Sequence, residues 1–466
     1  MLFTRSFIAS ILLASLASAL PLERRQGRGQ KQGRPRLSGN RGVKKAPVMN
    51  TLNSTRIEMG DAANSTEVVG AAYFITNEED GNFIVSADIV SDGQLVLRQA
   101  LPAGGAGIRG DDGGQNNPAP LFSSGSVRVS AAQSLVATVN SGSNTLALFS
   151  INADDNAILE PVGQPVGSGG EFPVSVAFNS KGDKLCALNG GEINSVRCFS
   201  VDKQTGLAPL AGTARSLGLT QTTPATGAPG SLSHLIFSED DKQLIVTAKG
   251  LPAGDGAQEQ DGFVQVFDVA ADGSLSAQPK SLDLPQGGNA PFGMAIVPKK
   301  NEVLVTDPAI GFSLFDLSGQ ADATAVEVDG QIAIGWASFS PKIGNFFLSD
   351  VATGIITEVN VGDNQNATIV KQYELGADSG TEDSDVATVG DKDFLYVLAG
   401  GATAVNVLSL DAPGQAKPIQ TLDIAGPAAA AGLTINGINL QGMAVFVKQA
   451  ANANRNNGNQ AVVFGN

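Results

Sequence analysis

The sequence predicts an all-β protein, a seven-bladed β-propeller closed by its own C-terminal strand. Short runs of Val, Ile, Leu and Phe alternate with clusters of Gly, Asp, Asn and Ser, and helical periodicity is almost absent, which is typical of strands and turns. The pattern also repeats, with corresponding apolar residues spaced by 49, 59, 60 and 42 residues. Repeats of roughly 40–50 residues with four strands each are the signature of propeller blades.

The repeat is clearest over residues 231–268, which read as a strand, a polar hairpin, a second strand, a glycine-rich loop and a third strand. This copy contains the only histidine of the chain, His234. The apolar residues that align near the end of each first strand are Val129, Phe178, Phe237, Val297 and Phe339. Further first strands are predicted at residues 384–389 and 440–447.

The count of seven blades depends on how the ring closes. Residues 69–101 supply only three strands, and residues 440–447 at the far end of the chain would supply the missing first strand. This closure hides two edge strands that would otherwise be free to pair with other chains. Rings of six or eight blades remain alternatives.

Both termini differ in composition from the repeat. Residues 1–19 have a basic start, an apolar run and Ala17-Ser18-Ala19, as in a secretory signal peptide. Residues 20–66 are expected to be a basic, disordered pro-segment or linker, residues 67–449 the propeller, and residues 450–466 a C-terminal tail. Arg24-Arg25 and Lys44-Lys45 are candidate processing sites.

Charge limits the partners. Beyond residue 45 the chain has 20 basic and 44 acidic residues, a net charge of −24. Such a body is unsuited to nucleic acid or to an anionic membrane surface. No apolar run is long enough to span a membrane. The sequence therefore predicts a secreted protein, extracellular or associated with a cell wall.

Two features fit an oxidising, secretory compartment. Cys186 and Cys198 lie on consecutive predicted strands and are expected to form a disulfide, although two buried free thiols are the alternative. The N-glycosylation sequons begin at Asn53, Asn64 and Asn366.

Loop lengths indicate which face carries function. The long connections are residues 102–125 and 218–230, each before a first strand, and residues 249–262, between a second and a third strand. In a four-stranded blade, both kinds of connection emerge on one face. Long loops gathered on one face usually bind ligands, so we expect a small-molecule or cell-wall ligand there.

The candidate site lies where first strands line the central channel. His234 aligns with Trp336, the only tryptophan, and Asp385 lies at the corresponding end of the sixth first strand. Nearby carboxylates that could join them are Glu382, Asp383, Asp307 and Asp350. Such a channel mouth could bind a small polar ligand or a cation, with no metal identified and no cofactor required. The alternative is that His234 is structural and the carboxylates cap turns.

The sequence lacks the motifs of other common catalytic, nucleotide-binding and metal-binding sites. The sequence contains no G-x-S-x-G and no P-loop, and one histidine excludes H-E-x-x-H. Residues 105–110 match G-x-G-x-x-G but open no helix. Residues 152–156 lack the glycine and the glutamate of a calcium loop.

The chain resembles the lactonase-like seven-bladed propellers, which include 6-phosphogluconolactonase and the carboxymuconate cyclases, and particularly secreted fungal proteins similar to those cyclases. The resemblance rests on the blade pattern, on Ser233-His234-Leu-Ile-Phe-Ser before a polar turn, and on hairpins such as residues 271–275. In that family a Pro-His strand start places histidine at the channel, and here Ser233 replaces the proline. The family's catalytic members also use arginines, which makes Arg128 and Arg197 the candidates here.

Two functions remain open from the sequence. In the first, the protein acts on lactones or cyclic carboxylates, with His234 as general acid or base and Arg128 or Arg197 holding the anionic group. In the second, a non-catalytic propeller binds a glycan, a protein or a cation through its long-loop face. The discriminating feature is an arginine that points into the channel beside His234.

Overall fold

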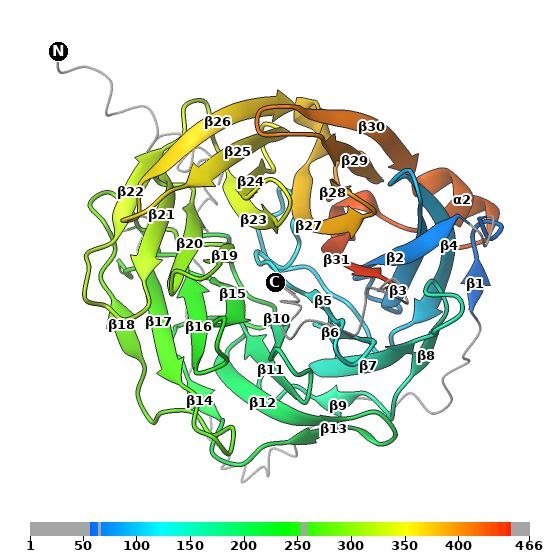
Figure 1. Cartoon of the computed structure of the whole chain (residues 1–466). Coiled ribbons are helices and arrows are strands. Elements are labelled where there is room, and N and C mark those ends of the chain that lie inside the picture. The colour runs from blue at the N-terminus through cyan, green and yellow to red at the C-terminus, as the bar shows by residue number, and fades with distance from the viewer. Residues whose placement is uncertain (1–55, 64–66, 253–258, 449–466) are drawn as a thin grey trace, which may run out of the picture. The chain divides into compact units, whose positions relative to one another are not determined.

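Seven antiparallel sheets are arranged as blades around a central axis in the computed structural model, which describes residues 56–63, 67–252 and 259–448 (Figure 1). The innermost strand of each blade is nearest the axis, and the following strands lie progressively further out. The predicted all-β, seven-bladed fold is therefore confirmed.

The strands are grouped by blade, each blade starting from its innermost strand. Blade 1 comprises β31 (Gln441–Val447), β2 (Val68–Ile75), β3 (Phe83–Val90), β4 (Leu95–Pro102) and β1 (Ile57–Glu58); blade 2 comprises β5 (Val127–Ser130), β6 (Leu135–Asn140), β7 (Thr145–Ile151), β8 (Leu159–Pro161) and β9 (Val166–Gly167); blade 3 comprises β10 (Pro173–Phe178), β11 (Lys184–Asn189), β12 (Ser195–Asp202), β13 (Gly206–Pro209) and β14 (Arg215–Ser216). Blade 4 comprises β15 (Leu232–Phe237), β16 (Gln243–Ala248), β17 (Phe263–Asp268) and β18 (Lys280–Leu282); blade 5 comprises β19 (Met294–Val297), β20 (Glu302–Asp307), β21 (Gly311–Asp316) and β22 (Thr324–Glu327). Blade 6 comprises β23 (Ile334–Ser340), β24 (Asn345–Asp350), β25 (Ile355–Val361) and β26 (Ala367–Glu374); blade 7 comprises β27 (Thr381–Val389), β28 (Lys392–Ala399), β29 (Ala404–Leu410) and β30 (Ala416–Asp423). Short helices occur in two connections: η1 (Ala377–Ser379), α2 (Ala425–Ala430) and η2 (Gly437–Asn439).

Closure of the ring follows the prediction. β31 pairs antiparallel with β2, with Tyr73 opposite Ala444, so the C-terminal strand becomes the innermost strand of the blade that the N-terminal strands begin. The inner edge of β2 is therefore covered, because β31 supplies the backbone partners that it would otherwise lack.

Apolar side chains from facing sheets fill the spaces between neighbouring blades. One cluster, which includes Ile245 and Val303, lies between blades 4 and 5, and another, which includes Leu304 and Phe346, lies between blades 5 and 6. Each sheet is covered on both faces, which explains why many strands read as nearly continuous apolar runs rather than as strict alternations.

The ordered unit begins earlier than expected. Residues 57–59 fall in the segment predicted as a disordered linker, yet β1 pairs with β4 and the Met59 side chain is buried. Ile57 and Met59 pack against the apolar cluster of blades 7 and 1, which gives this short stretch a reason to order. The predicted signal peptide and the sequons at Asn53 and Asn64 lie outside the described residues, whereas Asn366 is exposed in the hairpin between β25 and β26.

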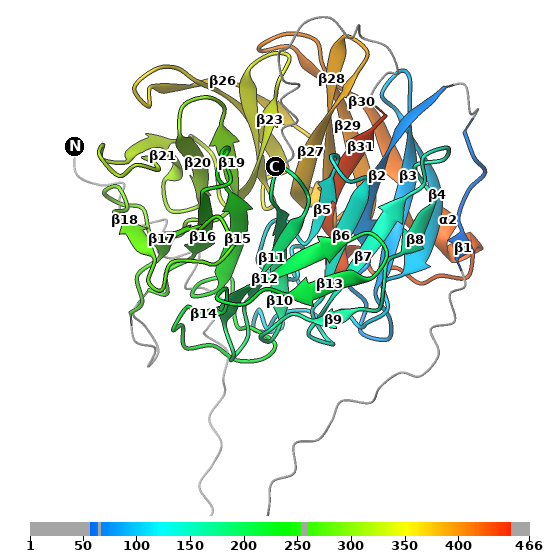
Figure 2. The same cartoon turned by 60° about the horizontal axis from the view of Figure 1, so that its bottom comes forward.

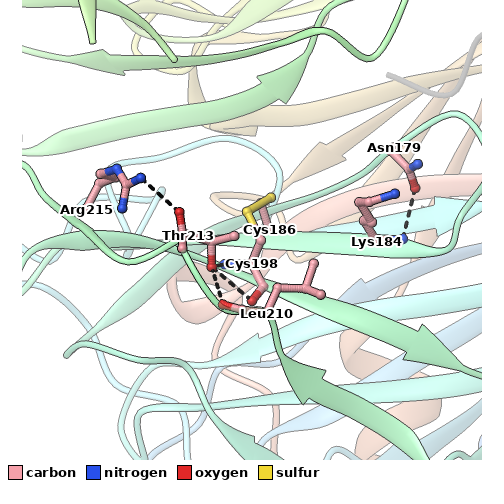
Figure 3. Close-up of a disulfide and its surroundings, with 8 residues drawn as sticks. Asn179, Lys184, Cys186, Cys198, Leu210, Thr213 and Arg215 are labelled. Atoms are coloured by element: carbon pink, nitrogen blue, oxygen red, sulfur yellow. Dashed lines mark hydrogen bonds between the residues drawn. A yellow bond between two sulfur atoms is a disulfide. The ribbon is translucent and has the colours of Figure 1, made fainter. Parts of the chain in front are cut away.

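Blade 3 carries the predicted disulfide. Cys186 of β11 lies directly opposite Cys198 of β12, with their Cα atoms 3.9 Å apart and the sulfurs bonded. The Thr213 hydroxyl accepts a hydrogen bond from the Cys198 amide at 3.1 Å, close to the bridge (Figure 3). The disulfide expectation is confirmed.

The ring has two different ends, between which the strands run (Figure 2). We call one the hairpin end, because the hairpins that follow the innermost strands lie there. The other is the long-loop end, where residues 103–126, 217–231 and the described parts of the β16–β17 connection (249–252 and 259–262) lie. A fourth long connection, residues 424–440 with α2, joins blade 7 to β31 at the same end and was not singled out from the sequence. Among the described residues, no helix has the length and apolarity needed to cross a membrane.

Candidate site on the ring axis

The long loop before blade 2 turns inward and crosses the ring axis. Its last part, Leu121–Gly125, is here called the axial segment, and all five of its residues are buried. Ser123 is the central member: its carbonyl oxygen accepts from Trp336 Nε1 and from Gln441 Nε2, each at 3.1 Å, and its hydroxyl donates to the Val174 carbonyl at 2.8 Å. One residue thus connects blades 6, 1 and 3.

The residues on either side of Ser123 form hydrogen bonds to further blades. The Lys249 amine of blade 4 donates to the Phe122 carbonyl at 2.8 Å. The Gly125 amide and the Ser124 hydroxyl both donate to Asp383 Oδ1 of blade 7, at 3.1 and 3.2 Å. The axial segment is therefore hydrogen-bonded to the innermost parts of most blades and closes the axis at the long-loop end.

The backbone of this region is unusual. Phe122 has a φ of 54° and the nearby Ala119 a φ of 67°, both in the left-handed region that side chains disfavour. Such conformations cost ~1–3 kcal/mol each and persist where surrounding contacts impose them. The hydrogen bonds around Ser123 provide those contacts.

This arrangement corrects the expected position of the candidate residues. His234, Trp336, Glu382 and Asp383 were expected at a channel mouth on the long-loop face, but they are buried beneath the axial segment. A ligand site at that face is therefore not supported. The reason is that the loop before blade 2 is long and apolar enough, through Leu121 and Phe122, to fold into the ring.

His234 lies on β15 and reaches two other blades. Its Nδ1 accepts a hydrogen bond from the Met294 amide of blade 5 at 3.0 Å, on the axis-facing edge of β19 that no strand pairs with. Burial, and then the positive charge of Arg128, lower the pKa of His234 well below 6.5, so the ring is neutral near pH 7. A neutral imidazole that accepts at Nδ1 carries its proton on Nε2.

Arg128 lies on β5 of blade 2 and contacts His234 of blade 4. Its Nη2 is 2.6 Å from His234 Nε2, and both groups are buried. Because an arginine only donates and Nε2 carries a proton, neither group can accept from the other. An oxygen atom that both could reach would satisfy the two donors together. The feature that the sequence left to decide, an arginine beside His234, is present.

Two carboxylates of β27 lie near this pair. Asp385 accepts from the Val445 and Val386 amides at 2.9 and 2.8 Å. Burial raises the pKa of Asp385 to about 6, and the positive charge of Arg128 opposes that rise. Asp383 accepts from Gln441 Nε2 at 2.5 Å and the Gly442 amide at 3.0 Å in addition to its axial-segment donors. Asp383 therefore joins the axial segment to β31. Asp385 is half-buried and can change its charge near pH 6.

Glu382 lies deeper. It is fully buried, and burial followed by the negative charge of Asp383 raises the pKa of Glu382 well above 4.5. Gly400 is packed so closely that a Cβ there would overlap the Glu382 carboxyl group. The Glu382 carboxyl group is therefore enclosed by the protein and does not lie at a channel mouth.

Trp336 supports the axial segment. Its indole donates to Ser123 and its ring meets Phe292 edge-on, with centroids 5.0 Å apart. The indole is therefore buried against the protein itself.

Asp307 and Asp350 act as turn caps. Asp307 ends β20 and accepts from the Ala290 and Ala309 amides, at 3.1 and 2.9 Å. Asp350 ends β24 in the next blade and accepts from the Ile332 and Thr353 amides, at 2.7 and 3.1 Å. Their geometry matches the turn-capping alternative that the sequence left open.

Arg197 is placed differently from Arg128. It lies on β12, the third strand of blade 3, and its stem packs against Gly169, where a Cβ would fall 2.7 Å from Arg197 Cγ. The two arginines were paired as candidates because both fall in predicted strands, but only Arg128 is on an innermost strand.

Sequence reasoning missed Lys249 and Gln441. The Lys249 amine is buried, donates to Ser233 Oγ at 2.8 Å and lies 4.3 Å from the centroid of Phe292. Burial lowers the pKa of Lys249 well below 10.5. Its signal was a lysine directly after a predicted strand at the start of a long loop. No group of three or more His, Cys, Asp or Glu side chains in the described ranges is arranged to hold a metal ion.

Comparisons with known proteins agree with this architecture. The family model "Lactonase, 7-bladed beta-propeller" matches residues 67–218, which span most of blades 1 to 3. No curated protein matches the chain.

Solved structures share the fold. A periplasmic gluconolactonase from Pseudomonas aeruginosa is 15% identical with a TM-score of 0.55, covering 77% of this chain and 96% of that one. A candidate 6-phosphogluconolactonase from Bacteroides fragilis is 15% identical with a TM-score of 0.52, covering 78% and 98%. A corresponding protein from Bacteroides uniformis, also 15% identical, has a TM-score of 0.54 and covers 76% and 97%. At this identity the structures establish likeness of fold alone. Together with the matched family model, the closed seven-bladed ring supports the lactonase-like β-propeller family for this chain.

Proposed function

We propose that the protein is a lactonase-like enzyme that acts on a lactone or cyclic carboxylate at Arg128 and His234. The observation that carries the proposal is their contact at 2.6 Å, in which two buried donors face each other because the Met294 amide occupies the acceptor nitrogen of the ring. Converging, fixed donors stabilise the negative charge that develops on a carbonyl oxygen. A substrate oxygen is the acceptor that both lack.

The proposed hydrolysis uses Asp385 as the base. Ionised Asp385 takes a proton from water, and the hydroxide adds to the lactone carbonyl while Arg128 and His234 donate to its oxygen. The ring C–O bond then breaks, the leaving oxygen takes the proton back from Asp385, and the product is a hydroxy acid. With a pKa of about 6, Asp385 is mostly ionised at neutral pH and close enough to that pH to transfer protons. His234 thus serves as a donor rather than as the base.

We also propose that the protein is exported. The Cys186–Cys198 disulfide and the exposed Asn366 sequon support this, because structural disulfides persist in oxidising compartments. Mass spectrometry of the protein from culture medium would test it, with an intact disulfide and a glycan on Asn366 expected. An exclusively intracellular, unmodified chain would contradict it.

The test is turnover. Purified full-length protein would be followed by proton release on a panel of lactones and muconates between pH 4 and 8. We expect kcat/KM to rise through pH ~6, to fall about 100-fold or more in Arg128→Ala, and to lose the pH dependence in Asp385→Asn. His234→Asn is the matched histidine variant, because its side-chain oxygen can still accept from Met294.

Arg197→Ala is the control and should retain activity. Equal activity in Arg128→Ala and Arg197→Ala would show that Arg128 at the ring axis takes no part in the reaction. Absence of turnover over the whole panel would refute catalysis on those substrates and favour the alternative of a non-catalytic binding propeller.

A further inference from the structure

The innermost strands are buried to different extents along their length. Near the long-loop end, Ile334, Trp336 and Gln441 are buried beneath the axial segment. Further along, exposure begins: Ala337 and Val445 are half-buried in the middle of their strands. The same change occurs along β27, which is buried to Ser384 and half-buried at Asp385 and Val386.

The position of these residues in the ring indicates the direction from which solvent reaches them. A residue in the middle of an innermost strand has a paired strand on its outer side and a neighbouring blade on each face. The remaining direction is the ring axis. Since the axial segment closes the long-loop end, solvent reaches these residues from the hairpin end.

The side chains at this level are mainly apolar. Half-buried aliphatic residues come from five blades: Val129, Ile296, Ala337, Val386 and Val445. Asp385 is the only ionisable residue among the half-buried residues of the seven innermost strands. The Arg128–His234 pair is buried next to this level, because Arg128 directly precedes the half-buried Val129 on β5.

We infer that the substrate enters from the hairpin end and that it is an amphipathic lactone, one whose ring carries an alkyl or acyl chain. The inference rests on the proposed function and names its substrate class. The lactone carbonyl would reach Arg128 and His234, and the chain would lie against the aliphatic residues. A polyhydroxylated or phosphorylated sugar lactone fits poorly, because its polar groups would lose water without gaining partners there.

Charge agrees with this assignment. Two buried basic side chains, Arg128 and Lys249, lie near the axis, but the Lys249 amine already donates to Phe122 and Ser233. Arg128 alone is left for an anionic group, and Asp383 and Asp385 lie close enough to affect its pKa. One carbonyl or carboxylate oxygen suits such a site better than a phosphate.

The test compares a lactone that carries an alkyl chain with the same ring without the chain and with a polyhydroxylated lactone. Full-length protein would hydrolyse δ-valerolactone, δ-decanolactone and glucono-δ-lactone, followed by proton release. We expect kcat/KM at least tenfold higher for δ-decanolactone than for the other two. The double variant Val386→Thr/Val445→Thr, which keeps side-chain shape, should lose most of that preference. Val361→Thr, a half-buried valine on β25, is the matched control and should keep it.

Binding supplies a second readout. Thermal unfolding with the products should show stabilisation by 5-hydroxydecanoate and none by gluconate at the same concentration. Equal turnover of all three lactones, or a preference unchanged in the double variant, would overturn the inference and leave the proposed function standing. Without turnover, the proposed function fails, and equal binding of the two products would then overturn the inference as well.

Discussion

The long-loop end and the hairpin end of the ring differ in what covers the innermost strands at the ring axis. At the long-loop end, Leu121–Gly125 crosses the axis and is held by hydrogen bonds to Val174, Lys249 and Asp383. At the hairpin end, the first and second strands of a blade are joined by a few residues, such as Pro341–Gly344, which are too short to reach the axis. The comparison shows that loop length alone does not identify a ligand-binding face, since the longest loop closes the ring.

Removal of Asp383 is expected to have the largest effect on stability. Asp383→Ala leaves buried donors from Gly125, Gln441 and Gly442 without their acceptor, which should lower the free energy of unfolding by about 3–5 kcal/mol. Denaturant unfolding would measure it. Asp363→Ala, whose exposed carboxylate pairs with Lys300 at 3.2 Å, should cost less than about 0.5 kcal/mol. Equal losses would mean that the axial segment is not anchored by Asp383.

A buried carboxylate at the long-loop end should make stability depend on pH. Burial raises the pKa of Asp307 from 3.8 to about 6, so the folded protein binds this proton more tightly than the unfolded chain does. The contribution of the protonated group is therefore present at acidic pH and is lost as pH rises from about 4 to 6.

Asp307→Asn keeps the acceptor oxygen and removes the titration. Compared with this variant, the wild type should lose up to about 3 kcal/mol between pH 4 and 7, from a shift of about two pKa units. Unfolding curves across that range would measure the difference. Parallel curves for the two proteins would contradict the assignment.

Removal of the disulfide should lower stability without affecting the proposed site at the ring axis. Cys186→Ala/Cys198→Ala should lower the free energy of unfolding by about 2–3 kcal/mol, because the bridge restricts the unfolded chain. Reductant should shift the wild type to the same value and leave the double variant unchanged. Activity on lactones should survive at temperatures where the variant is folded, since β11 and β12 are not innermost strands.

The smallest expected difference in stability is between alanine substitutions of two glycines, one at the long-loop end and one at the hairpin end of the ring. Gly125 has a φ of 81° and a Cβ there would lie 2.9 Å from both Arg128 Nη2 and His234 Nε2, whereas Gly344 has a φ of 74° and free space. Alanine should cost about 1–2 kcal/mol for backbone strain at either position. At Gly125 an additional ~1 kcal/mol is expected from overpacking. If thermal unfolding gave equal losses, the close contact over Arg128 and His234 would be wrong.

Much of the fold could be read from the chain. The anchors Val129, Phe178 and Phe237 do lie at or next to the ends of innermost strands, because a blade repeats its hydrophobic pattern. The site was harder. Arg128 and His234 are 106 residues apart and lie on blades 2 and 4, so no local pattern connects them. Arg197 matched Arg128 in local sequence context, and only strand order separates them.

The local pattern of residues predicted the strands, favoured seven blades closed through blade 1, and favoured a bridge between Cys186 and Cys198, because these features depend on short-range periodicity and on turns. Only the tertiary structure decided that Leu121–Gly125 fills the ring, that Asp307 and Asp350 cap turns, and that Arg128 meets His234. The physical reason is that the axis is the place where residues from all blades converge. Hydrogen bonds and close contacts there join groups that are distant along the chain, such as the Gly125 amide with Asp383 and Arg128 with His234.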